Sequence, residues 1–222
     1  MSVVVLKVGG ASTGGVAEAV ADLRAAGNQV CVVHGAGPQI SEEMERRGLV
    51  PQFVGGRRVT TAEALEVVCE SFAVVNAAVC AAIGTDAVGL SGDQIGLHAE
   101  PVPELGHVGR AVPSAPPAVL VALAAGLVPV VSPLAPGPLN VNADEAAAAL
   151  AVGIGASRIR FLTDVPGVYR DGELVESISA RCAEKLVHAG SFEGGIVPKV
   201  LAAARAARSG LIAEIGVTAV TA

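Results

Sequence analysis

Lysine is rare in this chain, and two of its three lysines lie beside glycine pairs. The chain has twelve arginines but only Lys7, Lys185 and Lys199, with Lys7 just before Gly9-Gly10 and Lys199 shortly after Gly194-Gly195. An ammonium group is a compact charge that can follow a moving phosphoryl group, whereas a guanidinium is a rigid fork. A cation at a helix start is otherwise unfavourable, so this position favours a functional role for Lys199 over a solvated one. Lys185 is expected mid-helix at the surface.

Two glycine-rich turns could bind an anion. Lys7-Val8-Gly9-Gly10-Ala11 leaves the first valine-rich run, and His34-Gly35-Ala36-Gly37-Pro38 leaves the second. Glycine lets the backbone approach an anion closely, and a following helix offers unpaired N–H groups. Either turn alone could be a mere tight connection, and neither matches the P-loop or the dinucleotide fingerprint. At neighbouring strand ends, the two together predict an anion site.

A carboxylate that could hold the two lysines lies in the segment 139–144, Leu-Asn-Val-Asn-Ala-Asp. Asn142 or Asp144 could instead cap the helix that is expected to begin there. The functional interpretation places Asp144 between Lys7 and Lys199. Spacing alone leaves both interpretations open.

Two further segments could contact substrates. Arg57-Arg58, beside Gly55-Gly56, could bind a carboxylate in bidentate fashion or form a charged hairpin tip. The turn 162–168 ends a buried strand and could face a nucleotide, although such a turn is not diagnostic alone. No nucleophile–base pair stands out in the sequence.

The elements that must position these residues alternate between short valine-rich strands and alanine-rich helices. Continuous apolar strands are buried on both faces, as in parallel sheets covered by helices, so the pattern predicts one α/β domain, an open sandwich. We expect a hairpin at Gly55-Gly56 and further hairpins before Val112. The expected strands are 3–8, 30–33, 87–90, 128–131, 159–163 and 212–215, and the expected helices are 16–26, 39–47, 62–83, 118–125, 145–152, 184–189 and 200–208.

Composition excludes several classes of function. A net charge of −6 and an aromatic content of 2% over 222 residues disfavour nucleic acid as a partner. The four cysteines form no CxxC pair and fit a reducing compartment. Prolines and a glycine divide the uncharged stretch 111–143 into pieces too short to span a membrane. With Lys7 interrupting the first apolar run, we expect neither a signal peptide nor a membrane partner.

Eight segments occur in an order that resembles the amino acid kinase family, and they extend from residue 3 to about residue 200. They read KVGG (7–10), VVHGAGPQI (32–40), GGRRVT (55–60), VGLSGD (88–93), LGHVGR (105–110), LNVNADEAA (139–147), LTDVPGV (162–168) and GGIVPKV (194–200). Each alone is weak, whereas eight in order are strong.

The resemblance implies an open αβα sandwich with a mainly parallel central sheet, in one continuous domain. It implies an N-terminal lobe, 1–155, for acyl-amino-acid binding and dimerisation, and a C-terminal lobe, 156–222, for ATP binding. The implied reaction is phosphorylation of the γ-carboxylate of N-acetyl-L-glutamate by ATP, in cytoplasmic arginine biosynthesis. Mg²⁺ would be held mainly by the nucleotide phosphates, with no protein metal site. A carboxylate acceptor is already ionised at neutral pH and needs no general base.

Residue roles implied by the resemblance can be assigned position by position. Lys7 would contact the phosphoryl group from the acyl-substrate side and Lys199 from the nucleotide side, and Asp144 would organise both lysines. The residues implied to bind the acyl substrate or the transferring phosphoryl group are Gly10, Ala36, Gly37, Arg58 and Asn140. The residues implied to contact ATP are Gly9, Asp164, Val165, Gly167, Tyr169, Ser191 and Glu193.

The sequence departs from the family pattern in three places. Ala36 replaces the middle glycine of HGGG, and its methyl group fits only if φ is negative. The segment after Lys199 is short, so the closing strands and the loop between them are expected to be compressed. This would alter the adenine site. The first strand begins at Val3, without an extra helix resembling that of arginine-inhibited hexamers, so we expect a homodimer without arginine feedback.

Two alternative functions remain. A kinase of glutamate or aminoadipate attached to a carrier protein would need a basic surface for an acidic carrier, and the net charge of −6 disfavours it. A catalytically silent acylamino-acid sensor is suggested by Ala36 and the short C-terminus. The presence of Lys7, Asp144 and Lys199 argues against the sensor.

Overall fold

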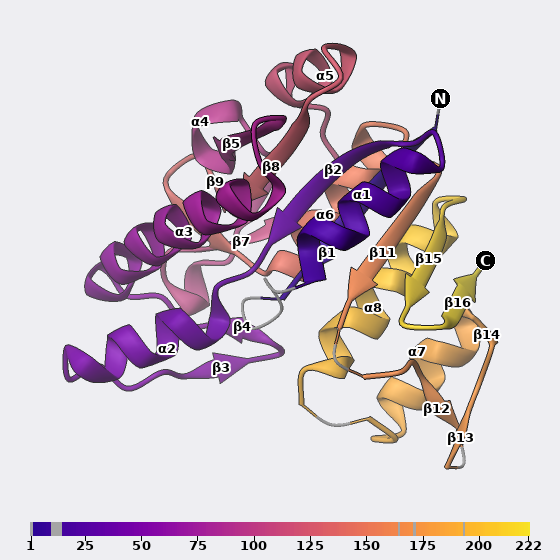
Figure 1. The fold of residues 1–222 in the computed structure, drawn as a ribbon. Helices are drawn as coiled ribbons and strands as arrows, with labels where there is room; N and C mark the ends of the chain where they lie inside the picture. Colours follow the sequence, from indigo (N-terminus) through magenta and orange to yellow (C-terminus); the bar gives the residue numbers. More distant parts are fainter. Residues whose placement is uncertain (1, 10–14, 164, 171, 193) are drawn as a thin grey trace.

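A computed structural model describes residues 2–9, 15–163, 165–170, 172–192 and 194–222. Its centre is an eight-stranded sheet in the order β14-β16-β15-β11-β1-β2-β8-β5, which runs across the whole molecule (Figure 1). Neighbouring strands are parallel except for the antiparallel pair β15–β16. The strands are β1 Val3–Val8, β2 Gln29–His34, β5 Ala87–Ser91, β8 Val128–Ser132, β11 Arg158–Leu162, β14 Ser177–Ser179, β15 Ile212–Ile215 and β16 Thr218–Thr221.

Helices cover both faces of this sheet, so the predicted αβα sandwich with a mainly parallel sheet is confirmed. Along β1, Val4 and Leu6 face a core shared with α1, α2 and α3, whereas Val5 faces a core shared with α5, α6, α7 and α8. This alternation follows from the two-residue period of a strand. The helices are α1 Val16–Ala25, α2 Gly37–Arg46, α3 Ala62–Ile83, α5 Pro117–Ala124, α6 Ala143–Gly153, α7 Ala180–His188 and α8 Ile196–Arg208.

Alanine dominates the second of these cores. Buried alanines line α6 from Ala146 to Ala149 and α8 from Ala202 to Ala204. Helices α6 and α8 also pack against each other. Because a methyl group is short, alanine lets helix and sheet backbones approach closely. At one end of this layer, the charged residues Lys7 and Asp144 are buried.

Smaller sheets flank the central one. A hairpin joins β3 Phe53–Val54 to β4 Arg57–Arg58, as predicted from Gly55-Gly56. A four-stranded sheet has the order β6-β7-β10-β9, and β12 pairs with β13. The bounds are β6 Ala99–Pro101, β7 Val108–Ala111, β9 Leu134–Ala135, β10 Leu139–Val141, β12 Tyr169–Arg170 and β13 Glu173–Leu174.

The structure differs from the sequence-based expectation in several segments, and helix α8 begins four residues before the expected 200–208. Between β5 and Val112 there is a helical turn, α4 (Gly92–Ile95), and a 3₁₀ turn, Pro103–Leu105, as well as the hairpin β6–β7. Helix α7 begins four residues early, because Ser179 Oγ accepts a hydrogen bond from Cys182 N and caps it. The prediction that 212–215 is the last strand is wrong, since β16 follows it as an antiparallel neighbour with Thr218 and Val220 buried.

Within the described residues, α3 alone is long and apolar enough to cross a membrane by length and composition, with a mean hydropathy of 1.7. Its buried side chains, among them Val68, Phe72 and Val75, belong to the core that contains β1 and β2. The apolar composition of this face is therefore explained by packing on the sheet.

Candidate active site

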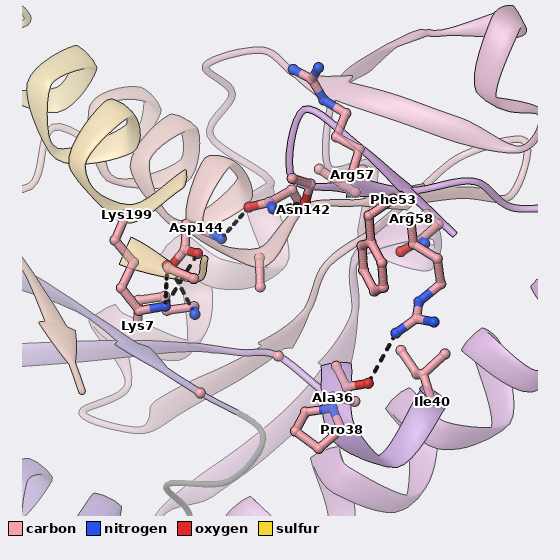
Figure 2. A pocket seen from close by; sticks show the side chains of 18 of the residues that line it. Lys7, Ala36, Pro38, Ile40, Phe53, Arg57, Arg58, Asn142, Asp144 and Lys199 are labelled. Atoms are coloured by element: carbon pink, nitrogen blue, oxygen red, sulfur yellow. Dashed lines mark hydrogen bonds and ion pairs between the residues drawn. The ribbon is translucent and has the colours of Figure 1, made fainter. Parts of the chain in front are cut away.

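A pocket of about 420 Å³ opens where β1 and β2 end, and most of the predicted site residues line it (Figure 2). The residues brought together are Lys7, Gly9, Ala36, Gly37, Arg58, Asn140, Asp144 and Lys199. They come from strands, turns and helix starts as far apart in the sequence as residues 7 and 199. The position agrees with the general rule that ligands of parallel sheets bind beyond the carboxyl ends of the strands.

Lys7 points to the α6–α8 side of the sheet, because it alternates with Leu6 and Val8 along β1. There its Nζ lies 2.8 Å from Oδ1 of Asp144. Lys199, in the first turns of α8, places Nζ 3.7 Å from Oδ2 of the same carboxylate and 3.3 Å from the carbonyl oxygen of Gly195. The expectation that Asp144 lies between the two lysines matches this geometry.

Asn142 resolves the two interpretations left open for this segment. Its Oδ1 accepts hydrogen bonds from the backbone N–H groups of Asp144 and Glu145, at 2.9 and 3.2 Å, and so caps α6. The Asp144 side chain is thereby left for the lysines, as Figure 2 shows. Capping and ion pairing are both present, on two different residues.

The electrostatics of this cluster favour an anion. Two ammonium groups face one carboxylate, so the cluster carries a net charge of +1 although the whole chain carries −6. Burial lowers the pKa of Lys7, Asp144 opposes this shift, and the nearby Lys199 adds to it. Binding a negatively charged group here would offset the repulsion between the two lysines.

The turn from His34 to Pro38 forms the next wall. Ala36 is the N-cap residue of α2 with φ −142°, and Pro38 lies in the first turn of the helix. This negative φ is the condition under which a methyl group is tolerated at that position. Gly9 also lines the pocket, whereas Gly10 lies outside the described residues.

Arg58 faces the lysine cluster from the other side of the pocket. Its guanidinium group donates to the carbonyl oxygen of Gly37 and to Ser41 Oγ, at 3.0 and 2.8 Å, and lies over the ring of Phe53 at 4.6 Å. Arg58 is 6% exposed, and burial lowers its pKa. Among the described residues, no carboxylate forms an ion pair with Arg58.

Thr60 lies behind this wall, outside the pocket lining, and the sequence did not indicate it. It is fully buried, donates its hydroxyl to the carbonyl oxygen of Arg58, and accepts a hydrogen bond from Asn140 Nδ2 at 3.0 Å. Arg58 and Asn140 are thus linked through one hydroxyl group. Its position within the GGRRVT segment was the available signal, but threonine is too common in turns to stand out.

The β3–β4 hairpin is fastened to the start of α6. Arg57 pairs with Glu145 at 2.9 Å, and Asn142 Nδ2 donates to the carbonyl oxygen of Gly56 at the same distance. These contacts join segments more than eighty residues apart. No local pattern could have predicted them.

Gly9 apart, the described residues that were expected to contact ATP do not line this pocket. Val165, Tyr169 and Ser191 are exposed and do not line the pocket. Gly167 is buried, and a Cβ there would lie 2.5 Å from Thr218 Oγ1, so close packing requires glycine. Asp164 and Glu193 lie outside the described residues.

A second cavity, of about 450 Å³, lies at the ends of β11 and β15. It shares Leu162 and Thr163 with the first pocket, and its other lining residues include Arg160, Glu214 and Val217. The two cavities are therefore neighbours along the edge where the parallel strands end.

The donor set of the main pocket offers little to a metal ion. The described residues contain no group of three or more His, Cys, Asp or Glu side chains placed to hold one. Both Asp144 oxygens already face lysine ammonium groups. The pocket thus fits a Mg²⁺ ion carried by phosphate oxygens better than one held by side chains.

Comparisons with known proteins agree with the geometry. The model of the amino acid kinase family matches residues 2–215. An acetylglutamate kinase of Rubrobacter xylanophilus is 44% identical, over 97% of this chain and 88% of its own length, and that of Geobacillus kaustophilus is 40% identical over 90% and 83%.

Solved structures show the same fold at low identity. A Streptococcus mutans protein superposes with a TM-score of 0.90 at 24% identity, covering 99% of this chain and 98% of its own. A carbamate kinase of Giardia lamblia bound to AMP-PNP gives 0.71 at 16% identity, covering 99% and 98%. With the family model matching nearly the whole chain and relatives at 40–44% identity, the chain belongs to the amino acid kinase family.

Proposed function

We propose that the chain transfers the γ-phosphoryl group of ATP to the γ-carboxylate of N-acetyl-L-glutamate, forming N-acetyl-L-glutamyl 5-phosphate for arginine biosynthesis. The observation that carries this proposal is the buried Lys7–Asp144–Lys199 cluster, across one pocket from Arg58. Relatives named acetylglutamate kinase support the choice of acceptor.

On the acceptor side, Arg58 binds the α-carboxylate and Asn140 helps to fix the substrate. A guanidinium group held by Gly37 and Ser41 keeps donors for a bidentate contact. Gly10 and the backbone N–H groups of Ala36 and Gly37 cradle the transferring phosphoryl group. Such donors are effective because they are oriented before the reaction begins.

At the centre, the lysines neutralise charge on the phosphoryl oxygens. Lys7 contacts the group from the acceptor side and Lys199 from the nucleotide side, and Asp144 holds both ammonium groups in place. Mg²⁺, bound mainly to the ATP phosphates, supplies further charge neutralisation. Because the acceptor is already a carboxylate, no side chain has to remove a proton.

The nucleotide is assigned to the C-terminal lobe, residues 156–222, and the acyl substrate to the N-terminal lobe, residues 1–155. The second cavity shares Leu162 and Thr163 with the pocket that contains the lysine cluster, and this supports the division. The residues proposed to contact ATP are Gly9, Asp164, Val165, Gly167, Tyr169, Ser191 and Glu193.

The protein is further proposed to be a cytoplasmic homodimer. Helix α3 leaves a stripe of small apolar side chains exposed, including Ala73, Val74, Ala77 and Ala81. Pairing two such stripes would remove this surface from water. Light scattering at micromolar concentration measures the oligomeric state, and a monomeric mass would contradict the proposed homodimer.

The test is an ADP-release assay with MgATP and each of N-acetyl-L-glutamate, L-glutamate and N-acetyl-aminoadipate. Turnover with N-acetyl-L-glutamate alone is expected. Turnover only with N-acetyl-aminoadipate would change the assigned acceptor. Calorimetric binding of N-acetyl-L-glutamate without turnover would favour the silent sensor and refute the kinase.

A further inference from the structure

A buried histidine lies behind the phosphoryl cradle and is not used by the proposed reaction. His34, the last residue of β2, is fully buried and precedes the turn that contains Ala36. Its ring meets Phe72 of α3 edge to face, with centroids 6.0 Å apart. Burial lowers the pKa of His34 to about 4, so the imidazole is neutral at the pH of an enzyme assay.

Asn76 of α3 reaches this ring from the helix layer on the same face of the sheet. Its Nδ2 donates to the carbonyl oxygen of Val130 at 2.9 Å and lies 3.1 Å from Nε2 of His34. On its other side, Asn76 Oδ1 lies 3.7 Å from the thiol of Cys80. The Asn76 side chain is therefore held from three directions, by β8, by β2 and by its own helix.

These contacts fix where the imidazole proton lies. A carbonyl oxygen can only accept, so the Asn76 amide must present its NH₂ group to Val130. The second N–H of that group then points at His34 Nε2, which must be the accepting nitrogen. The proton of the neutral ring consequently lies on Nδ1, 3.4 Å from the carbonyl oxygen of Gly35.

Gly89 shows that the fold makes room for this arrangement. A Cβ at Gly89 would lie 2.2 Å from Asn76 Oδ1 and 3.3 Å from Cys80 Sγ. No side chain with a Cβ fits at that point on β5 while Asn76 stays in place. Glycine at position 89 thus leaves the space that the Asn76 amide group occupies.

The Gly35 carbonyl belongs to the peptide unit that also carries the Ala36 N–H. Because that unit is planar and trans, the N–H of Ala36 points away from the carbonyl oxygen and hence away from the His34 ring. Gly35, Ala36 and Gly37 all line the pocket on this side. Another hydrogen bond, from Gly35 N to the carbonyl oxygen of Val8, anchors the preceding peptide unit, between His34 and Gly35.

We propose that Asn76 and His34 are positioning residues, which hold the Gly35–Ala36 peptide unit so that the Ala36 amide is aimed at the transferring phosphoryl group. This inference rests on the proposed function for the identity of the anion. The hydrogen-bond relay from Val130 through Asn76 and His34 to Gly35 stands independently of it.

The relay is tested first without substrate, by NMR of the protein labelled with ¹⁵N-histidine. The spectrum of His34→Gln identifies the His34 signals among the four histidines. We expect a neutral ring protonated at Nδ1 in the unaltered protein and a changed tautomer in Asn76→Ala. A His34 ring protonated at Nε2 would overturn the inference, whatever the activity.

The positioning role is tested by kinetics. Asn76→Ala and Asn76→Asp, neither of which can donate to both Val130 and His34, should lower kcat on the order of tenfold or more. The KM for ATP should stay unchanged, and Glu66→Ala, at an exposed position of the same helix, should behave like the parent. Melting curves identify a variant that fails to fold, and His34→Gln then provides the second measurement.

Two outcomes separate this inference from the proposed function. If kcat of Asn76→Ala equals that of Glu66→Ala, the positioning role is refuted while the kinase assignment stands. If the parent protein phosphorylates none of the acceptors, the proposed function fails. In that case the Kd for N-acetyl-L-glutamate replaces kcat as the readout, and an equal Kd in Asn76→Ala and Glu66→Ala refutes the positioning role.

Discussion

Lys7 and Arg58, proposed for the acceptor side of the pocket, are 4% and 6% exposed, whereas Val165 and Tyr169, proposed for the nucleotide side, are 37% and 47% exposed. The acceptor side has its charges buried and hydrogen-bonded before any substrate binds. The nucleotide side offers exposed loops beside a shared cavity. The acceptor-side charges are therefore desolvated when the protein folds, and not when the substrate binds. Contacts on the nucleotide side must form when the nucleotide binds.

Substitution of Lys7 should show this difference most strongly. Lys7→Met leaves Asp144 buried with Lys199, at 3.7 Å, as its one remaining cationic partner among the residues that the structure describes. We expect the free energy of unfolding to fall by about 3 kcal/mol and kcat to fall by roughly a thousandfold. Chemical denaturation and ADP release measure the two effects, with the exposed Lys185→Met as the matched control. A Lys7→Met protein as stable as that control would contradict the view that the buried charges of the acceptor side contribute to folding stability.

Lys199→Met should separate activity from stability. Lys7 still pairs with Asp144 at 2.8 Å in this variant, and the Lys199 side chain is 16% exposed, against 5% for Lys7. We expect kcat to fall by roughly a hundredfold or more, while the free energy of unfolding changes by less than about 1 kcal/mol. If Lys199→Met lowers the free energy of unfolding as much as Lys7→Met does, then both lysines contribute equally to stability.

The acceptor side should also lose stability in acid through His34. An unfolded histidine binds its proton near pH 6.5, whereas burial lowers the pKa of His34 to about 4. Between these values the unfolded state binds more protons, so the free energy of unfolding decreases as the pH falls from about 6.5 to about 4. The decrease is at most about 3 kcal/mol. Denaturation across this range should show a shallower slope for His34→Gln, and equal slopes would refute the assignment.

Arg58→Lys tests substrate recognition on the acceptor side alone. A lysine keeps the charge but loses the bidentate fork. We expect the KM for N-acetyl-L-glutamate to rise by roughly tenfold, with the KM for ATP unchanged. Initial-rate kinetics with each substrate varied in turn measure both values. An equal rise in the KM for ATP would show that Arg58 serves both sides.

Ala36→Gly should have the smallest effect. With φ at −142°, the parent backbone is unstrained for alanine, so glycine chiefly adds freedom to the unfolded chain. The free energy of unfolding should decrease by about 0.5–1 kcal/mol, and kcat should stay within about threefold of the parent. Should kcat instead rise tenfold, the methyl group narrows the cradle after all.

The sequence predicted the parts of the site that lie next to glycine turns or helix starts. Lys7, Lys199 and the segment around Asp144 could be identified because residue type and local spacing carry the signal. Thr60, Glu145 and Asn76 could not be identified, because their partners lie 80, 88 and 42 residues away in the sequence. Shortened closing strands were expected after Lys199, but β16 was not among the strands given bounds, because the pattern Thr-Ala-Val-Thr is too short to separate from a turn.

The alanine-rich layer of α6 and α8 has a practical consequence for protein engineering. Its buried methyl groups, from Ala146 to Ala149 and from Ala202 to Ala204, leave little room for larger side chains. Overpacking such positions typically costs about 1–3 kcal/mol. A library meant to change the acceptor should therefore leave this layer untouched and randomise positions that line the pocket without holding its charges, such as Val108 and Leu162.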